Sequence, residues 1–504
     1  MPILLNVLSS SDQKVVEQGC LCVCRVVESF RYKPEQLEEL IEPDLLRAVL
    51  RLLLPGTTNL IGPHIHTYFL RILGIICKSS PRLSVELLKM NIVDTLYQIL
   101  TGVSPPSDEG IGPAKSDTVH IMQALIHRPR EQVYETLNIV YELLPAASKG
   151  SVVLLDDQLR FTLGGGPLPL SVTPKIKAMG EKRLELLKQC QPEIKRFATI
   201  LLPTLTDVYS STVNLRVRQK VLLAQLKMVQ ALDVNIIEEA LRSVPYASFL
   251  AGILSQKDHI SLVALALQCA ELLYERLRDI YQYQFHREGV INEIKALATA
   301  SVLGKDDKPA EEKSGLVLGS KNHLSHDDGV NHGHDNDSGN EHDIQDDIHD
   351  HEDESNDEDE FNGDYPDDPE HHDEHEHEHD DASDSEASSI VHPPAQSLDH
   401  TLQDLITNGA KHFLELYEES KTAGMHEKAE VVLATLRGLT EKIEDCYKAP
   451  VVGNRGFKLF SKLAAYFDQN ALDSITSYEL LNSGIIRVLV DVIENSKGTY
   501  FSYE

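Results

Sequence analysis

The sequence predicts an all-α protein built as an α-solenoid, a stack of short helical repeats, interrupted by a long disordered insert. Apolar residues recur at helical spacing in one segment after another across residues 1–300, and again across residues 395–504. Strand signals are weak, since the best run, Val152–Leu155, is short and isolated. Between these helical regions the composition changes abruptly over residues 301–394. The chain of 504 residues is long enough to bury large apolar cores in the helical parts.

Single segments show the helical pattern in detail. Pro43 suits the first turn of a helix over Asp44–Leu54, which Pro55 and Gly56 then end. The apolar residues of this helix recur at helical spacing: Leu46, Val49, Leu50 and Leu53. A longer helix after Asp258 is apolar almost all round, so it requires cover on both sides, as inside a stack of repeats.

A faint internal repeat supports stacking. Three helices are expected to open with Gly or Asn followed by two β-branched residues: Asn91-Ile92-Val93, Gly289-Val290-Ile291 and Gly484-Ile485-Ile486. Gly and Asn tolerate a left-handed turn, and the apolar pair would fill the layer between repeats. The pattern favours an armadillo/HEAT-like solenoid in which these residues begin the third and longest helix of a repeat. The alternative is ordinary helix starts in an unrelated helical domain.

The predicted organisation has three parts. Residues 1–300 form armadillo-like repeats, with loops near 102–129 and 146–175 that are rich in Gly and Pro. The first loop has room for a short helix around Ile121–Ile126. Residues 301–394 form a disordered acidic, histidine-rich linker, and residues 395–504 contain further repeats, including helices over Ala429–Ile443 and Phe457–Phe467.

The acidity of the chain belongs to one segment. Of the formal net charge of −32, Lys321–Ile390 contributes −27, from 28 Asp and Glu against one Lys, and the rest of the chain contributes −5. Because binding of nucleic acid needs clustered Lys and Arg, this distribution argues against a nucleic-acid ligand.

The cellular setting follows from the cysteines and the apolar runs. The seven cysteines are odd in number and mostly lie within apolar helical patterns, which fits reduced thiols. We detect no signal peptide and no apolar run of the roughly 18–20 residues that a membrane helix needs. The expectation is a protein of the cytoplasm and/or the nucleus that has no membrane partner.

Within the acidic insert, 12 of the chain's 22 histidines lie between His323 and His379. Its run His375–His379 matches the HExxH zinc-protease pattern, but that pattern needs a stable helix with both histidines on one face. The surrounding low-complexity sequence offers no apolar side on which such a helix could pack. A solvated spacer is the favoured interpretation; weak metal binding and phosphorylation at Ser355 and Ser383 stay open.

No constellation of catalytic residues stands out. Gly164–Gly166 is followed by Pro167 and lacks the Gly-Lys-Ser/Thr of a phosphate-binding loop. Cys269 lies within an apolar stripe and is expected in the core, and His64 and His66 near a helix start indicate capping or surface packing. We therefore predict no catalytic, cofactor-binding or metal-binding residues and no cofactor.

Whole helices of the chain carry a resemblance to a known family, in the segments Val15–Phe30, Leu87–Leu96, Arg130–Leu137, Ser210–Lys220 and Tyr281–Val290. They resemble the armadillo region of HECT-type ubiquitin-protein ligases of the ubiquitin-fusion-degradation and thyroid-receptor-interacting family, and the last two segments resemble its fungal branch in particular. The resemblance covers about residues 1–145 and 195–300, and more loosely the helices after Leu398.

The resemblance implies a scaffold that recognises protein substrates, and further ubiquitin or a ubiquitin-conjugating enzyme, for ubiquitin-dependent degradation. In the family a C-terminal HECT domain carries the cysteine that accepts ubiquitin, whereas this chain has no such domain, so none of its cysteines inherits that role. We expect a truncated gene model or a separate fragment, and whether the chain counts as an enzyme stays open. The alternative is an armadillo/HEAT adaptor in transport or scaffolding. The sequence leaves the binding surface, the substrates and the oligomeric state open.

Overall fold

The computed structural model contains 22 α-helices and no strand among the residues it describes. The described residues are 2–54, 61–106, 118–145, 174–256, 258–299, 395–419, 423–448, 453–467 and 475–497. All of them belong to one unit, residues 1–306 and 393–504. The all-α prediction is confirmed. The predicted insert, the strand candidate Val152–Leu155 and most of the predicted loop near 146–175 lie outside the described residues.

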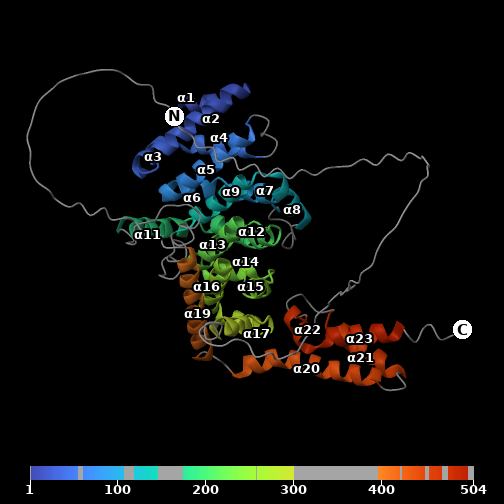
Figure 1. The fold of residues 1–504 in the computed structure, drawn as a ribbon. Coiled ribbons are helices and arrows are strands. Elements are labelled where there is room, and N and C mark those ends of the chain that lie inside the picture. The colour runs from blue at the N-terminus through green and yellow to red at the C-terminus, as the bar shows by residue number, and fades with distance from the viewer. Residues whose placement is uncertain are drawn as a thin grey trace, which may run out of the picture. The chain divides into compact units, whose positions relative to one another are not determined.

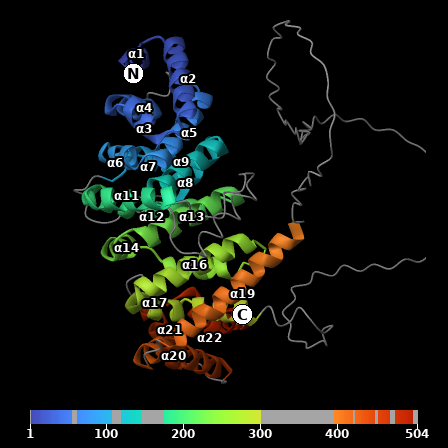
Figure 2. The ribbon, with the colours of Figure 1, turned by 90° about the vertical axis from the view of Figure 1, so that its left-hand side faces the viewer.

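One set of long helices forms the spine of this unit. Each packs on the next, α2 on α5, α5 on α9, α9 on α13, α13 on α16 and α16 on α19. Figure 1 shows these helices in successive layers, and Figure 2 shows α19 beside α16. Their bounds are α2 (Gln13–Ser29), α5 (Pro63–Ser79), α9 (Arg130–Leu143), α13 (Leu215–Ala231), α16 (Ile260–Arg276) and α19 (Ala395–Glu419). The packing is that of a helical-repeat solenoid, in which each layer buries the apolar side of its neighbour.

Mostly shorter helices connect the long ones and complete each layer. Up to α9 they are α1 (Pro2–Leu8), α3 (Pro34–Leu40), α4 (Pro43–Leu53), α6 (Pro81–Lys89), α7 (Ile92–Thr101) and α8 (Thr118–His127). Between α9 and α19 they are α11 (Pro174–Lys188), α12 (Gln191–Ser210), α14 (Val234–Leu241), α15 (Tyr246–Leu254), α17 (Arg278–Arg287) and α18 (Val290–Thr299). The helices after α19 are α20 (Ala423–Lys448), α21 (Gly453–Ala465), α22 (Ser477–Ser483) and α23 (Ile485–Lys497).

Helices predicted from apolar spacing are found close to their expected positions. The helix expected over Asp44–Leu54 is α4, and α8 occupies the place of the short helix expected at Ile121–Ile126. The apolar helix after Asp258 is α16, and Cys269 in it is fully buried, which confirms its place in the core. Burial raises the pKa of the Cys269 thiol to about 12, because the thiolate loses its hydration. The predicted division into domains at residues 300 and 395 stays a prediction.

The left-handed helix starts are confirmed, but the helices that follow them are not the longest ones. Asn91, Gly289 and Gly484 have φ angles of 58°, 80° and 75°. The helices they open, α7, α18 and α23, have 10, 10 and 13 residues, whereas α5 and α16 have 17 each. The expectation of a third, longest helix is therefore wrong. Gly102, with φ of 77°, ends α7, and the long helix α9 comes later in the chain.

Two arginine side chains cap the ends of long helices. The guanidinium of Arg183 in α11 donates to the carbonyls of Cys77 and Lys78 at the end of α5, and to that of Glu142 at the end of α9. Arg276 of α16 donates in the same way to the carbonyls of Val229 and Leu232 beside the end of α13. The last carbonyls of a helix have no partner within that helix and carry negative partial charge, so these arginines both satisfy and neutralise them.

A buried ion pair joins α17 to α22. The Arg287 guanidinium donates to both carboxylate oxygens of Glu479, at 2.8 Å each, and both side chains are almost completely buried. Glu479 also accepts from the backbone N–H of Thr476, which completes a capping box at the start of α22. The Thr476 hydroxyl in turn donates to the carbonyl of Arg287 at 2.9 Å. Residues 192 positions apart are thus held in one hydrogen-bonded network.

The position of His66 differs from the one expected from the sequence. Capping or surface packing was expected, but the His66 side chain is buried in α5, and its Nε2 lies 3.2 Å from the carbonyl oxygen of Leu53. Burial lowers its pKa to about 4, with a smaller contribution from Arg128, while the Leu53 carbonyl acts in the opposite direction. His66 recurs at helical spacing with Ile65, Phe69 and Leu70, so it shares their buried side.

The lowered pKa of His66 predicts that the folded protein loses stability in acid. The unfolded chain binds a proton at His66 near pH 6.5 and the folded chain only near pH 4, so stability is lost as the pH falls between these values. The loss from one group is at most about 1.4 kcal/mol per pH unit. We expect His66→Met to flatten the pH dependence of the urea midpoint between pH 6.5 and 4. An equal change in the exposed neighbour, His64→Met, should leave that dependence unaltered; identical pH profiles for all three proteins would contradict the assignment.

Candidate functional site on the long helices

The long helices α5 and α9 each keep one side polar and partly exposed. On α5 the apolar residues Ile65, Phe69 and Ile72 point into the layer, which leaves the opposite side to polar residues. On α9 the buried side includes Val133, Leu137 and Val140. The polar sides of the two helices meet at a pocket.

Two contacts set the spacing of α5 and α9. The side-chain amide of Gln132 donates to the carbonyl of Pro63 at 2.9 Å and so fastens the start of α9 to the start of α5. Further along, Gly74 of α5 allows a close approach, since a Cβ at this position would lie 3.0 Å from Nδ2 of Asn138. A hydrogen bond therefore joins the two helices at their starts, and the missing side chain of Gly74 lets them lie close together further along.

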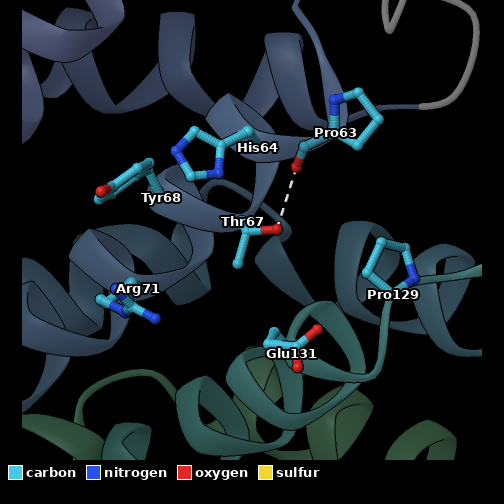
Figure 3. A pocket seen from close by; sticks show the side chains of 7 residues that line it. All are labelled: Pro63, His64, Thr67, Tyr68, Arg71, Pro129 and Glu131. Atoms are coloured by element: carbon cyan, nitrogen blue, oxygen red, sulfur yellow. Dashed lines mark hydrogen bonds between the residues drawn. The ribbon is translucent and has the colours of Figure 1, made fainter. Parts of the chain in front are cut away.

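The pocket between these helices has a volume of about 380 Å³ (Figure 3). In Figure 3 His64, Tyr68 and Arg71 come from α5, and Pro129 and Glu131 lie on the other side at the start of α9. Thr67 lies between them, and its hydroxyl donates to the carbonyl of Pro63 at 3.0 Å. The complete lining is Pro63, His64, Thr67, Tyr68, Arg71, Pro129 and Glu131.

Charge and aromatic contacts orient the lining. The Tyr68 ring packs edge to face against the His64 ring, with centroids 4.8 Å apart. The Arg71 guanidinium lies 5.7 Å from the centroid of the Tyr68 ring, and its Nε donates to the Glu135 carboxylate at 3.2 Å. Arg71 stays about half exposed, so it keeps donors for a ligand.

Two lysines of α13 contact α9. Lys220 and Lys227 place their ammonium groups 4.1 Å and 3.4 Å from the centroid of the Tyr141 ring, and Lys227 also donates to the Tyr141 carbonyl at 3.0 Å. Both lysines are nearly buried, so their role is to join α9 and α13.

The arrangement suits binding of a polypeptide. A tyrosine beside an arginine provides a stacking surface and donors for a carboxylate or carbonyl, and Glu131 provides an acceptor for a donor group. Within the described ranges no group of three or more His, Cys, Asp or Glu is placed to hold a metal ion. None of the helices described is both long and apolar enough to cross a membrane. The expectation that the chain has no catalytic, cofactor-binding or metal-binding residue stays a prediction.

His64 was expected to take part in capping or surface packing, and it lies exposed at the surface. Tyr68, Arg71 and Glu131 were not singled out from the sequence. The available signal was the spacing of His64, Tyr68 and Arg71, which puts them on one side of a helix. That spacing is equally typical of an ordinary solvated helix surface, and nothing local indicates that Pro129 and Glu131 lie opposite.

Comparison with known proteins agrees with the predicted resemblance. The chain is 30% identical over 341 residues to the E3 ubiquitin-protein ligase UPL3 of Arabidopsis thaliana, and 27% identical over 350 residues to the E3 ubiquitin-protein ligase TRIP12 of Danio rerio. It is 27% identical over 302 residues to a probable ubiquitin fusion degradation protein of Schizosaccharomyces pombe. These matches cover 60–64% of this chain but only 16–17% of each relative.

No family model matches the chain. Among solved structures, the crystal structure of an engineered protein matches 59% of this chain and 73% of its own length, with 13% identity and a TM-score of 0.21. That similarity is too low to support an argument about fold or function. The sequence relatives support a firmer statement: this chain is a homologue of one region of the ubiquitin-protein ligases UPL3 and TRIP12 and of the S. pombe ubiquitin fusion degradation protein.

Proposed function

We propose that this chain is the protein-recognition scaffold of a HECT-type ubiquitin-protein ligase and that it binds protein substrates through the exposed side of its long helices. The homology to E3 ubiquitin-protein ligases supports the ligase context. The single structural observation that carries the recognition role is the α5–α9 pocket, where Tyr68 and Arg71 are presented by a rigid layer. Repeated layers give a partner chain an extended surface to bind along.

The proposal extends to ubiquitin itself and to a ubiquitin-conjugating enzyme as partners. The similarity to a probable ubiquitin fusion degradation protein of S. pombe supports ubiquitin-fused proteins as the first probe. We further propose the cytoplasm and/or the nucleus as the location, since all seven cysteines are free thiols in the structure. Microscopy of a fluorescently tagged chain tests the location, and its retention in a secretory compartment would contradict it.

The recognition role predicts a defined loss of binding. We expect the purified full chain to bind a non-cleavable ubiquitin–reporter fusion in biolayer interferometry, and Tyr68→Ala combined with Arg71→Ala to weaken this binding by roughly 30-fold. Such a loss is typical of removing a central Tyr–Arg pair from an interface.

The chain offers a matched control elsewhere. Arg31 and Tyr32 form a similar exposed cation–π pair, with the guanidinium 4.5 Å from the ring centroid, in the connection after α2. Replacing both by alanine removes the same kinds of side chain and should leave binding unchanged. The proposal fails if neither the fusion nor free ubiquitin binds the wild-type chain, or if both pairs of substitutions weaken binding equally.

A further inference from the structure

Another pocket, of about 320 Å³, lies where α17, α18, α20 and α22 meet. Figure 1 shows α17, α20 and α22 close together, and α20 packs on both of the others. The volume is at the lower end of the range of ligand-binding pockets. The lining consists of His286, Arg287, Asn292, Lys295, Glu430, Leu433, Ala434, Arg437, Tyr478 and Glu479.

The wall that α22 contributes is held firmly in place. The ring of Tyr478 lies over Gly289, where a Cβ would collide with it. The side-chain amide of Asn292 donates to the Tyr478 hydroxyl, and the buried ion pair of Arg287 with Glu479 holds the same helix end. Because the Tyr478 hydroxyl accepts from Asn292, its own proton is available for a ligand.

Two cationic side chains of the lining keep donors to spare. The Nε of Arg437 donates to the carbonyl of Asn482 at 3.3 Å, which orients the guanidinium and leaves both Nη groups for other acceptors. Within the described ranges no carboxylate pairs with Arg437 or with Lys295, and both side chains are exposed. The pocket therefore presents an arginine, a lysine and a tyrosine hydroxyl as donors.

The charge of the lining selects the ligand. The ion pair between α17 and α22 is neutral within itself, which leaves Arg437 and Lys295 against Glu430. Glu430 lies seven residues before Arg437, about 10 Å away along α20, so the negative charge is at some distance from the guanidinium. One net positive charge suits one carboxylate, whereas Glu430 disfavours a doubly charged phosphate.

We propose that this pocket binds the carboxylate of an Asp or Glu side chain of a partner protein, with Arg437, Lys295 and the Tyr478 hydroxyl as donors. The inference does not rest on the α5–α9 pocket or on the function proposed for it. The donors come from α18, α20 and α22, so a bound segment joins helices from the two sides of residues 300–394. One acidic side chain with its neighbouring backbone corresponds to a dissociation constant on the order of 100 µM.

Fluorescence anisotropy of a labelled peptide of Glu and Gly, titrated with the full chain, tests the proposal. We expect a dissociation constant on the order of 100 µM, weakened by about tenfold in Arg437→Ala, because a charge-assisted hydrogen bond is lost. Tyr478→Phe keeps the ring over Gly289 and removes only the hydroxyl donor, so it should weaken binding by about fivefold. Unchanged far-UV circular dichroism would show that both variants fold.

The same helix offers a matched control. Lys442 of α20 is exposed and lies outside the lining, so Lys442→Ala removes the same charge and should leave binding unchanged. Glu430→Gln should instead tighten binding by about threefold, because it removes a charge of the same sign as the ligand. Tyr68→Ala with Arg71→Ala should have no effect, which separates this site from the α5–α9 pocket.

Several results would overturn the proposal. The full chain carries its own acidic residues 321–390, so binding of the peptide requires that they leave the pocket accessible, and absence of saturable binding contradicts the assignment. Equal weakening by Arg437→Ala and Lys442→Ala would also contradict it, as would equal binding of a peptide of Lys and Gly. Displacement of the peptide by inorganic phosphate far more readily than by acetate would identify a phosphate site instead.

Discussion

Replacing Glu479 by alanine is expected to lower the free energy of unfolding by about 3–5 kcal/mol, because it leaves the Arg287 guanidinium buried without its counter-charge. Hydrogen bonding to Glu479 raises the pKa of Arg287, so the arginine cannot escape the penalty by losing its proton. The substitution also removes the capping box of α22. Urea unfolding followed by circular dichroism measures the loss.

A surface ion pair provides the control for Glu479. Glu239 lies 2.9 Å from Lys195, with both side chains about half exposed, and Glu239→Ala should cost at most about 1 kcal/mol. The double variant Arg287→Met, Glu479→Met should recover much of the stability, since an apolar pair needs no counter-charge. Equal losses for Glu479→Ala and Glu239→Ala would show that the buried pair contributes no more than a surface one.

Arg183→Met is expected to cost about 3 kcal/mol, since it leaves buried carbonyls at the ends of α5 and α9 without a donor. The Arg183 side chain is 5% exposed, and burial lowers the pKa of its guanidinium. Arg183→Lys should recover only part of the stability, because one ammonium group cannot reach both helix ends in the same geometry. Thermal unfolding of the full chain compares the variants.

Arg47 is the matched control for Arg183. It lies on the surface of α4 in an ion pair with Asp44, with 65% of its side chain exposed. Arg47→Met should therefore change stability by no more than about 0.5 kcal/mol. If Arg183→Met is as mild as Arg47→Met, the cap between α5 and α9 contributes little to the stability of these layers.

Local features were predictable from the sequence. Asn91, Gly289 and Gly484 carry the left-handed turns expected of them because backbone strain depends on the residue itself. These helices were wrongly expected to be the longest of each repeat, because a helix start does not indicate how long the helices of the neighbouring layers are. Thr476 and Glu479 match a capping box in the sequence, which predicts the start of α22.

Long-range features were not predictable in this way. The sequence places Glu479 at a helix start but does not indicate that Arg287, 192 residues earlier, is its partner. The α5–α9 pocket depends on Gly74 and Gln132, whose contacts exist only once the layers have packed. His66 was misplaced because a polar residue near a helix start is usually exposed, whereas here the layer of α4 covers it through Leu53.

The contact between α18 and α19 has a consequence for how the chain tolerates change in length. These helices pack together although residues 300–394 separate them in sequence, so the helices before and after these residues belong to one stack. In general, each doubling of the length of a connection adds only about 0.6 kcal/mol to the free-energy cost of closing it. Evolution can therefore lengthen, shorten or recompose the stretch between α18 and α19 almost without effect on the layers on either side.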